Sequence, residues 1–202
     1  MAATTIKTST VYDSYFWVKW ESGGQDVSAN KTAINWSCGV KPGHKFYSNA
    51  VKMSAVTING VQVYAGGTYS NITDYKERTF ASGTLEVSHN ADGSKTLTVS
   101  AFSGKVWKED SGGYLTATAA AQSFQLPTIP RATVPSIGSA TIGEEVRIIL
   151  PRASSAFTHK LSYVFGAASG AIAENAGTEV QWTVPERVWR RRSPTAPSAQ
   201  AR

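Results

Sequence analysis

Residues 126–135 read Leu-Pro-Thr-Ile-Pro-Arg-Ala-Thr-Val-Pro, and this proline-rich stretch divides the chain into two parts. Its three prolines fix φ and lack a backbone donor, so neither a helix nor a central strand can run through it. The residue before each proline is also pushed towards an extended conformation. We therefore expect a semi-rigid extended connector, with a folded module on each side of it.

The part before this connector, residues 1–125, has the alternating pattern of β-strands and no helical period. In its first long strand, Phe16, Val18 and Trp20 fall on the face that a core would cover. A second strand over residues 33–40 places four apolar side chains in phase, and one of them is the single cysteine, Cys38. We expect this thiol to be a small buried hydrophobe.

Turn signals separate these strands. Asn59-Gly60 lies between two short apolar runs and is the strongest hairpin dipeptide, and Asn90-Ala-Asp-Gly93 is interpreted as a second hairpin. Together with several glycine pairs, these turns indicate roughly eight to ten short strands. The pattern predicts an all-β fold, with an antiparallel, jelly-roll-like β-sandwich over residues 1–125.

The part after the connector repeats this style on a smaller scale. Residues 136–186 contain three clear strand patterns, over 145–150, 157–165 and 179–184. An Ig-like sandwich usually needs about 100 residues, so we expect a small, incomplete Ig-like module here. Residues 187–202 are rich in arginine and have no apolar periodicity, which predicts a disordered tail.

The charge distribution argues against nucleic acid as a partner. The net charge is +6, but residues 1–129 hold eleven basic and nine acidic side chains, and residues 130–186 hold four and five. The remaining excess lies in the arginines of the tail. A nucleic-acid footprint would instead cluster on the surface of a folded domain. No apolar run approaches ~18 residues, so we also expect no membrane insertion.

Motifs for catalysis and metal binding are absent from the sequence. There is no nucleophile elbow, phosphate loop or His-Glu-x-x-His pattern, and the three histidines, His44, His89 and His159, lie far apart. We expect no enzyme activity, no metal and no cofactor. The N-terminus lacks the basic and apolar regions of a secretory signal, so the protein is expected to stay in a cytoplasm or to be released by lysis.

Four aromatic residues are the candidate ligand-binding side chains. Tyr15, Trp17, Trp107 and Tyr114 do not all fit one buried face of the predicted strands. Exposed flat aromatics on a β-sandwich can bind sugar rings through apolar stacking and edge hydrogen bonds. The alternative is that these rings pack under loops or against another subunit.

A string of short motifs resembles one known family. Ile129-Pro-Arg-Ala-Thr-Val-Pro-Ser-Ile-Gly138, Ser154-Ser-Ala-Phe-Thr-His-Lys-Leu161, Trp182-Thr-Val-Pro185 and the Ser88–Thr96 turn are similar to tail-associated minor structural proteins of siphophages that infect Gram-positive bacteria. The resemblance implies a virion protein of the distal tail, with a β-sandwich followed by Ig-like modules. It also implies host attachment, through cell-wall polysaccharide, and no catalytic residues. Members of the family continue with β sequence after the Trp-Thr-Val-Pro segment, where this chain has its arginine-rich tail.

Two functions are weighed on this basis. The first is a phage tail or baseplate protein, located in the virion and assembled in the host cytoplasm, with other tail proteins as partners. Tail-tip proteins usually form closed symmetric oligomers, so a homo-oligomer is expected. The second is a non-catalytic carbohydrate-binding module from a bacterial polysaccharide-degrading system, which the missing signal peptide disfavours.

Overall fold

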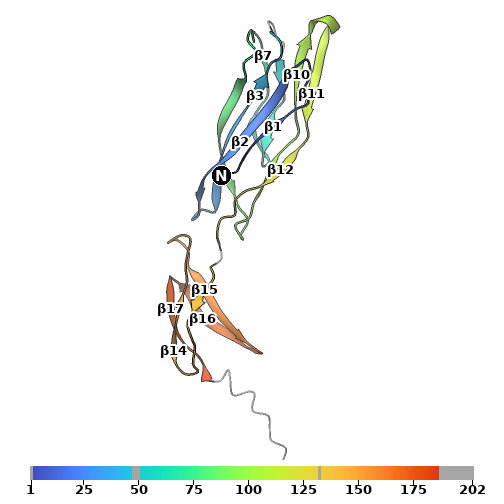
Figure 1. Ribbon diagram of the computed structural model, residues 1–202. Helices are drawn as coiled ribbons and strands as arrows, with labels where there is room; N and C mark the ends of the chain where they lie inside the picture. Colours follow the sequence, from blue (N-terminus) through green and yellow to red (C-terminus); the bar gives the residue numbers. More distant parts are fainter. Residues whose placement is uncertain (1, 47–50, 132, 187–202) are drawn as a thin grey trace, which may run out of the picture. The chain divides into compact units, whose positions relative to one another are not determined.

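The computed structural model describes residues 2–46, 51–131 and 133–186, and the chain forms two compact units, Met1–Pro130 and Arg131–Arg202 (Figure 1). Within the described residues the only helix is a single 3-10 turn, Glu109–Ser111, and all ladders between strands are antiparallel. The predicted all-β, sandwich-like fold is therefore confirmed. The predicted tail over 187–202 lies outside the described residues.

One layer of the first unit is a single four-stranded sheet, in the order β1-β2-β3-β8. Its strands are β1 (Ala3–Lys7), β2 (Tyr15–Asp26), β3 (Lys31–Lys41) and β8 (Arg78–Ser88). The register is continuous across the middle of this sheet, since Thr4, Trp20, Trp36 and Gly83 are successive cross-strand partners.

The other layer consists of two sheets that continue one another, with the orders β11-β10-β4-β7 and β12-β9-β5-β6. The strands are β4 (Val51–Met53), β5 (Val56–Ile58), β6 (Val61–Tyr64), β7 (Gly67–Tyr69), β9 (Thr96–Val99), β10 (Phe102–Lys108), β11 (Gly113–Ala119) and β12 (Gln122–Gln125). Only two residues separate the members of each consecutive pair, at 54–55, 65–66, 100–101 and 120–121. This layer therefore resembles four long strands, each of which is interrupted by two residues, and the four interruptions lie side by side across the layer.

Hydrogen bonds bridge this break. The Ser54 N–H donates to the Ser103 carbonyl, and the Ser103 N–H donates to Ser54 Oγ, both at 2.9 Å. The Ser54 side chain therefore satisfies a backbone donor that the interrupted ladder leaves without a backbone acceptor.

The core of the first unit lies between the two layers. Phe16, Val18 and Trp20 are all buried there, which confirms the core face predicted for β2. Phe16 of β2 lies against Gly104 of β10, where a Cβ atom would overlap the aromatic ring. The absence of a side chain at Gly104 therefore allows the two layers to approach one another at this point.

Cys38 is fully buried in the same core, as predicted. Burial disfavours the charged thiolate and raises the pKa of Cys38 to about 11. The thiol is therefore protonated at neutral pH, which is the condition of an unreactive structural cysteine rather than of a nucleophile.

The two predicted hairpins have different outcomes. Asn59 and Gly60 have φ values of 50° and 80°, and they join the paired strands β5 and β6. Positive φ at both positions is the signature of a type I′ turn, so this hairpin is confirmed. The turn over 90–93 does not form a hairpin, because β8 before it pairs with β3, and β9 after it pairs with β12 and β5. This turn instead carries the chain from one layer to the other.

The first half of the proline-rich stretch packs onto this crossover turn. The Leu126 N–H donates to the Lys95 carbonyl at 2.9 Å, and the Ile129 N–H donates to the Gly93 carbonyl at 3.0 Å. Both apolar side chains are buried, and Ile129 is fully inaccessible. Residues 126–130 are therefore an integral part of the first unit.

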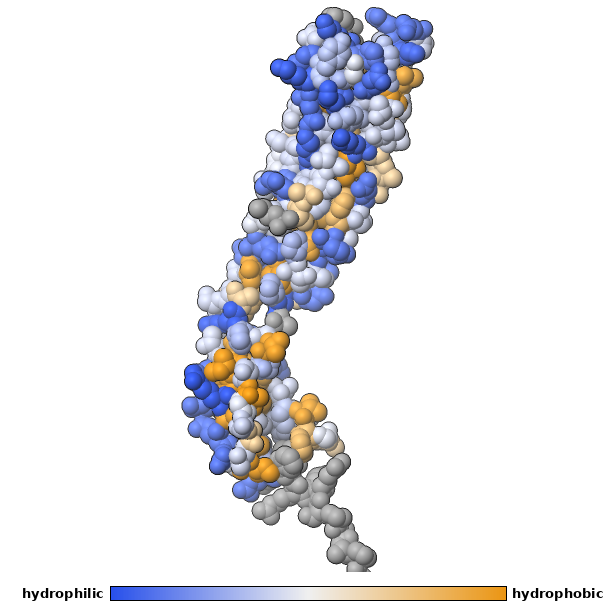
Figure 2. Space-filling view, in the orientation of Figure 1, coloured by the Kyte–Doolittle hydropathy of each residue, from blue (hydrophilic) through white to orange (hydrophobic). Residues whose placement is uncertain are grey.

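The second unit is smaller and contains two sheets. One has the order β13-β14-β17, with β13 (Ser136–Ile137), β14 (Glu145–Ile149) and β17 (Glu179–Thr183), and the other is the hairpin of β15 (His159–Phe165) and β16 (Ala168–Ala176). Its core has three buried residues, Ile148, Leu150 and Ala176. Apolar side chains gather on the face of this unit that Figure 2 shows, and Ile142, Val164 and Phe165 are among its exposed residues.

Candidate functional site

The four predicted aromatics lie on two opposite faces of the first unit. Tyr15 and Trp17 belong to β2 and have the phase opposite to its core residues, so they lie on the outer face of the β1-β2-β3-β8 sheet. Trp107 of β10 and Tyr114 of β11 lie on the outer face of the other layer. The core separates the two pairs, so the four side chains cannot form one site.

Trp17 is buried, which corrects the prediction that its ring is available for stacking on a sugar. Only 1% of its surface is accessible, although it lies on the outer side of the sheet. Gly39 leaves room for the ring edge, since a Cβ atom there would lie 2.6 Å from Trp17 Cζ2 and would overlap the Arg78 carbonyl. Lys19 Nζ lies 4.3 Å from the ring centroid. The ring therefore packs under neighbouring groups, which was the alternative left open by the sequence.

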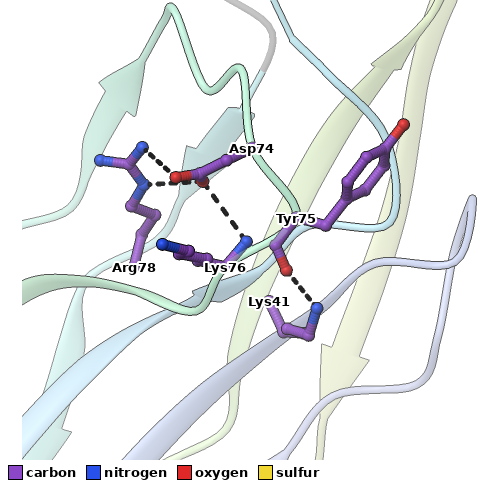
Figure 3. Close-up of polar contacts among 5 residues, drawn as sticks. All are labelled: Lys41, Asp74, Tyr75, Lys76 and Arg78. Carbon is purple, nitrogen blue, oxygen red and sulfur yellow. Dashed lines mark hydrogen bonds and ion pairs between the residues drawn. The ribbon is translucent and has the colours of Figure 1, made fainter.

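The segment over residues 74–78 is held by polar contacts (Figure 3). Its Arg78 carbonyl and the Trp17 ring both border the space beside Gly39. Asp74 accepts a hydrogen bond from Arg78 at 3.0 Å and one from the Lys76 N–H at 3.3 Å. Lys41 Nζ donates to the Tyr75 carbonyl, and Glu77 forms an ion pair with Lys19. Sequence patterns could not reveal these contacts, because Glu77 is 58 residues away from Lys19 along the chain.

Tyr15 is half-buried near the start of β2. The ammonium group of Lys7 lies 4.5 Å from the centroid of its ring, which is a cation–π arrangement. Close by in the sequence, Tyr12 stacks on His44 with ring centroids 3.6 Å apart and planes at 11°. Neither contact could be predicted from the spacing of residues along the chain, because each joins two segments whose pairing is not evident from the sequence.

Trp107 and Tyr114 are brought together by the structure. They are direct cross-strand partners in the β10–β11 ladder, so their side chains lie side by side on one face. The ring centroids are 5.1 Å apart and the planes are at 76°, an edge-to-face contact. Trp107 is 36% exposed and Tyr114 is half-buried, so the pair presents an aromatic surface to solvent.

Two lysines flank this aromatic pair. Lys52 Nζ lies 4.4 Å from the Tyr114 ring centroid, and Lys52 and Lys105 are cross-strand partners in the β4–β10 ladder. Within the described part of the chain, no carboxylate forms an ion pair with either lysine. The patch of Lys52, Lys105, Trp107 and Tyr114, which we call the aromatic patch, thus combines a ring surface with hydrogen-bond donors. Sequence reasoning identified its two aromatics and missed its two lysines.

The described residues contain neither a group of metal-ligating side chains nor a membrane-spanning helix. Among residues 2–46, 51–131 and 133–186, no three His, Cys, Asp or Glu side chains are placed so that they could hold a metal ion. The same residues contain no helix with the length and apolarity needed to cross a membrane. The aromatic patch is therefore the strongest of the predicted candidate sites.

Comparison with known proteins gives one result that bears on identity. No curated protein and no solved structure matches the chain. A family of siphovirus proteins does match it over residues 11–198, which is most of its length, and the description of this family names no catalytic activity. The chain therefore belongs to the family described as "Siphovirus protein of unknown function (DUF859)".

Proposed function

We propose that this siphovirus protein is a structural component of the phage tail or baseplate, and that it contributes to host attachment by binding cell-wall polysaccharide. The observation that carries the proposal is the aromatic patch, in which Trp107 and Tyr114 form an exposed edge-to-face pair beside Lys52. Membership of the siphovirus family supports the phage part of the proposal.

The chemistry of the patch suits a sugar ring. Aromatic faces offer apolar surface to the C–H groups of a sugar, and ammonium groups donate hydrogen bonds to its hydroxyls. Both rings are attached to paired strands and restrict one another, so little conformational freedom is lost on binding. Preorganisation of this kind favours binding by a small patch.

The same proposal covers partners and location. The protein acts without catalysis in the virion, with other tail proteins and a second copy of itself as partners, on a Gram-positive host. Neither nucleic acid nor insertion into a membrane has a part in it. A carbohydrate-binding module of a bacterial polysaccharide-degrading system would use the same patch, but the family match favours the phage protein.

Replacement of Trp107 tests this function. We expect Trp107→Ala to weaken retention of the full-length protein on purified host cell walls by about tenfold, because one stacking ring is lost. Phage that carry the variant should adsorb to host cells more slowly. The matched control is Tyr75→Ala, which removes an exposed aromatic ring that points away from its polar neighbours in Figure 3.

Unchanged retention and adsorption in the Trp107→Ala variant, with the fold intact, would contradict a binding role for the patch. Equal losses in the Trp107→Ala and Tyr75→Ala variants would also contradict it, since the effect would then not be specific to the patch.

A further inference from the structure

The outer face of the β1-β2-β3-β8 sheet is hollowed by an open groove with a volume of about 830 Å³. Three consecutive residues of each strand line it, from the ranges 3–5, 19–21, 35–37 and 82–84. The groove therefore crosses all four strands. Neighbouring strands lie about 4.8 Å apart, so its length is on the order of 14 Å.

The cross-strand register explains the shape of this groove. In each strand, the middle lining residue faces the core, so the floor of the groove consists of backbone atoms. The side chains of the residues on either side point outward and form two rims. The first rim consists of Ala3, Glu21, Asn35 and Thr84. The second rim consists of Thr5, Lys19, Ser37 and Ser82.

The first rim is a connected chain of polar groups. Thr84 Oγ1 donates to Asn35 Oδ1 at 2.9 Å, and Asn35 Nδ2 donates to Glu21 Oε1 at 3.5 Å. All three residues are exposed. An amide can make up to four hydrogen bonds, and a carboxylate has about four acceptor sites, so the rim keeps donors and acceptors for a ligand.

The second rim is held from outside the groove. Lys19 forms an ion pair with Glu77, which belongs to the segment over residues 74–78 described above. The other members of this rim, Thr5, Ser37 and Ser82, carry hydroxyl groups that can both donate and accept. Because Glu77 neutralises Lys19, Glu21 is the one formal charge that remains on the two rims.

These properties limit the kind of ligand. A residual carboxylate disfavours phosphate and other anions, which are attracted by unpaired basic groups. The rims offer no large apolar side chain, so they lack the apolar centre of a protein interface. A bound peptide strand would need unpaired backbone groups, but the backbones of β2 and β3 already pair within the sheet on both sides.

We propose that this groove binds a segment of an uncharged, polyhydroxylated glycan chain that lies across the four strands. Such a ligand matches both the mixture of donors and acceptors and the open, elongated form of the groove. The site lies on the face opposite the aromatic patch, so it is a second carbohydrate site, and it can exist whether or not the aromatic patch binds sugar.

An NMR titration of the full-length protein tests the groove. The probes are neutral tri- to hexasaccharides of glucose, galactose and N-acetylglucosamine, added singly to ¹⁵N-labelled protein. We expect saturable shifts of the amide signals from 19–21, 35–37 and 82–84 with at least one probe. The double variant Asn35→Ala/Thr84→Val should weaken this binding by about tenfold, because two polar contacts are removed.

Two further variants make the result specific. Ser37→Arg fills the groove from the second rim and should abolish the same shifts, and this keeps the test valid if the double variant does not fold. Thr98→Val on β9, which is exposed on the opposite layer and lies outside the aromatic patch, is the matched control and should bind like the wild type.

Three outcomes would overturn the groove site. The first is that no groove amide shifts with any neutral probe. The second is that the shifts occur only at 105–107 and 114–116 and disappear in Trp107→Ala, which would support the aromatic patch alone. The third is that groove shifts persist in both Ser37→Arg and the double variant.

Discussion

Gly104 shows how a single position can set the distance between two layers of a sandwich. It faces Phe16 across the core, and no side chain can occupy the space that the ring fills. A methyl group at this position would have to displace either the ring or the β10 backbone, in a region that contains many other buried side chains. The tolerance of the core to change should therefore be lowest here.

We expect Gly104→Ala to lower the free energy of unfolding by about 1–3 kcal/mol, because overpacking forces neighbouring groups from their preferred positions. Urea denaturation of the purified protein measures the change. The control is Gly24→Ala, since a Cβ atom at Gly24 would have no neighbour within 4 Å. A Gly104→Ala variant as stable as the wild type would contradict this prediction, since Phe16 and β10 could then move apart without loss of stability.

Cys38 leads to a prediction about pH. Its pKa is about 11 in the folded protein, above the ordinary value of 9.0, because the thiol is buried. Between pH 9 and 11 the folded state therefore keeps a proton that the unfolded state releases, so the free energy of unfolding falls as pH rises through this range.

We expect this decline between pH 9 and 11 to be steeper in the wild type than in Cys38→Ala, which has no thiol to ionise. Urea denaturation at several pH values measures both slopes. Other side chains that titrate in this range contribute equally to the two proteins, so parallel curves would contradict the pKa shift at Cys38.

The proline-rich stretch gives a prediction at the level of an element. Its first half packs on the crossover turn at 90–94, and Ile129 is fully buried there. We expect Ile129→Ala to destabilise the first unit by about 2–5 kcal/mol through loss of buried apolar contact. The control is Val134→Ala, which also precedes a proline but is 84% exposed and should cost at most ~0.5 kcal/mol.

Thermal unfolding followed by tryptophan fluorescence compares the two variants. Equal stability of Ile129→Ala and Val134→Ala would show that the first half of the stretch contributes nothing to the first unit, against the packing described above.

Whether a feature of an element could be predicted depended on how far apart along the chain its contacting residues lie. The core face of β2 and the Asn59-Gly60 turn follow from neighbours along the chain, and both predictions are confirmed. The burial of Trp17 and the packing of Ile129 depend on segments more than twenty residues away, which local patterns do not encode. The turn at 90–93 was recognised as a turn, but which strands it joins is set by the pairing of the whole sheet.

The candidate site follows the same rule. Trp107 and Tyr114 could be identified from composition and phase, because the strands on either side of a short turn pair directly. The contribution of Lys52 depends on the distant β4–β10 ladder, and the groove depends on the register of four strands. Neither could be derived before the pairing was known.

The two units differ in the size of their cores, and this difference should be visible in the whole molecule. Within the described residues, the core of the first unit has 21 buried residues and that of the second has three. The free energy gained by apolar burial is roughly proportional to the area buried, so the second unit should open more readily than the first.

Hydrogen exchange on the intact chain measures this difference. We expect the amides of β14, β15 and β16 to exchange faster than those of β2, β3 and β10, and proteases to cut first beyond Arg131. Uniform protection across both units, with one unfolding transition, would contradict independent stability of the two cores.

The break that runs across the second layer also bears on aggregation. A long, straight edge strand can recruit another chain and start aggregation, and natural proteins avoid this by keeping edges short or irregular. Here the interruptions leave edge segments of seven and four residues on one side, β11 and β12, and of four and three on the other, β6 and β7. In this layer a neighbouring chain would therefore find only short templates on which to add, so the long edge available for such pairing is β8 of the other layer, with 11 residues.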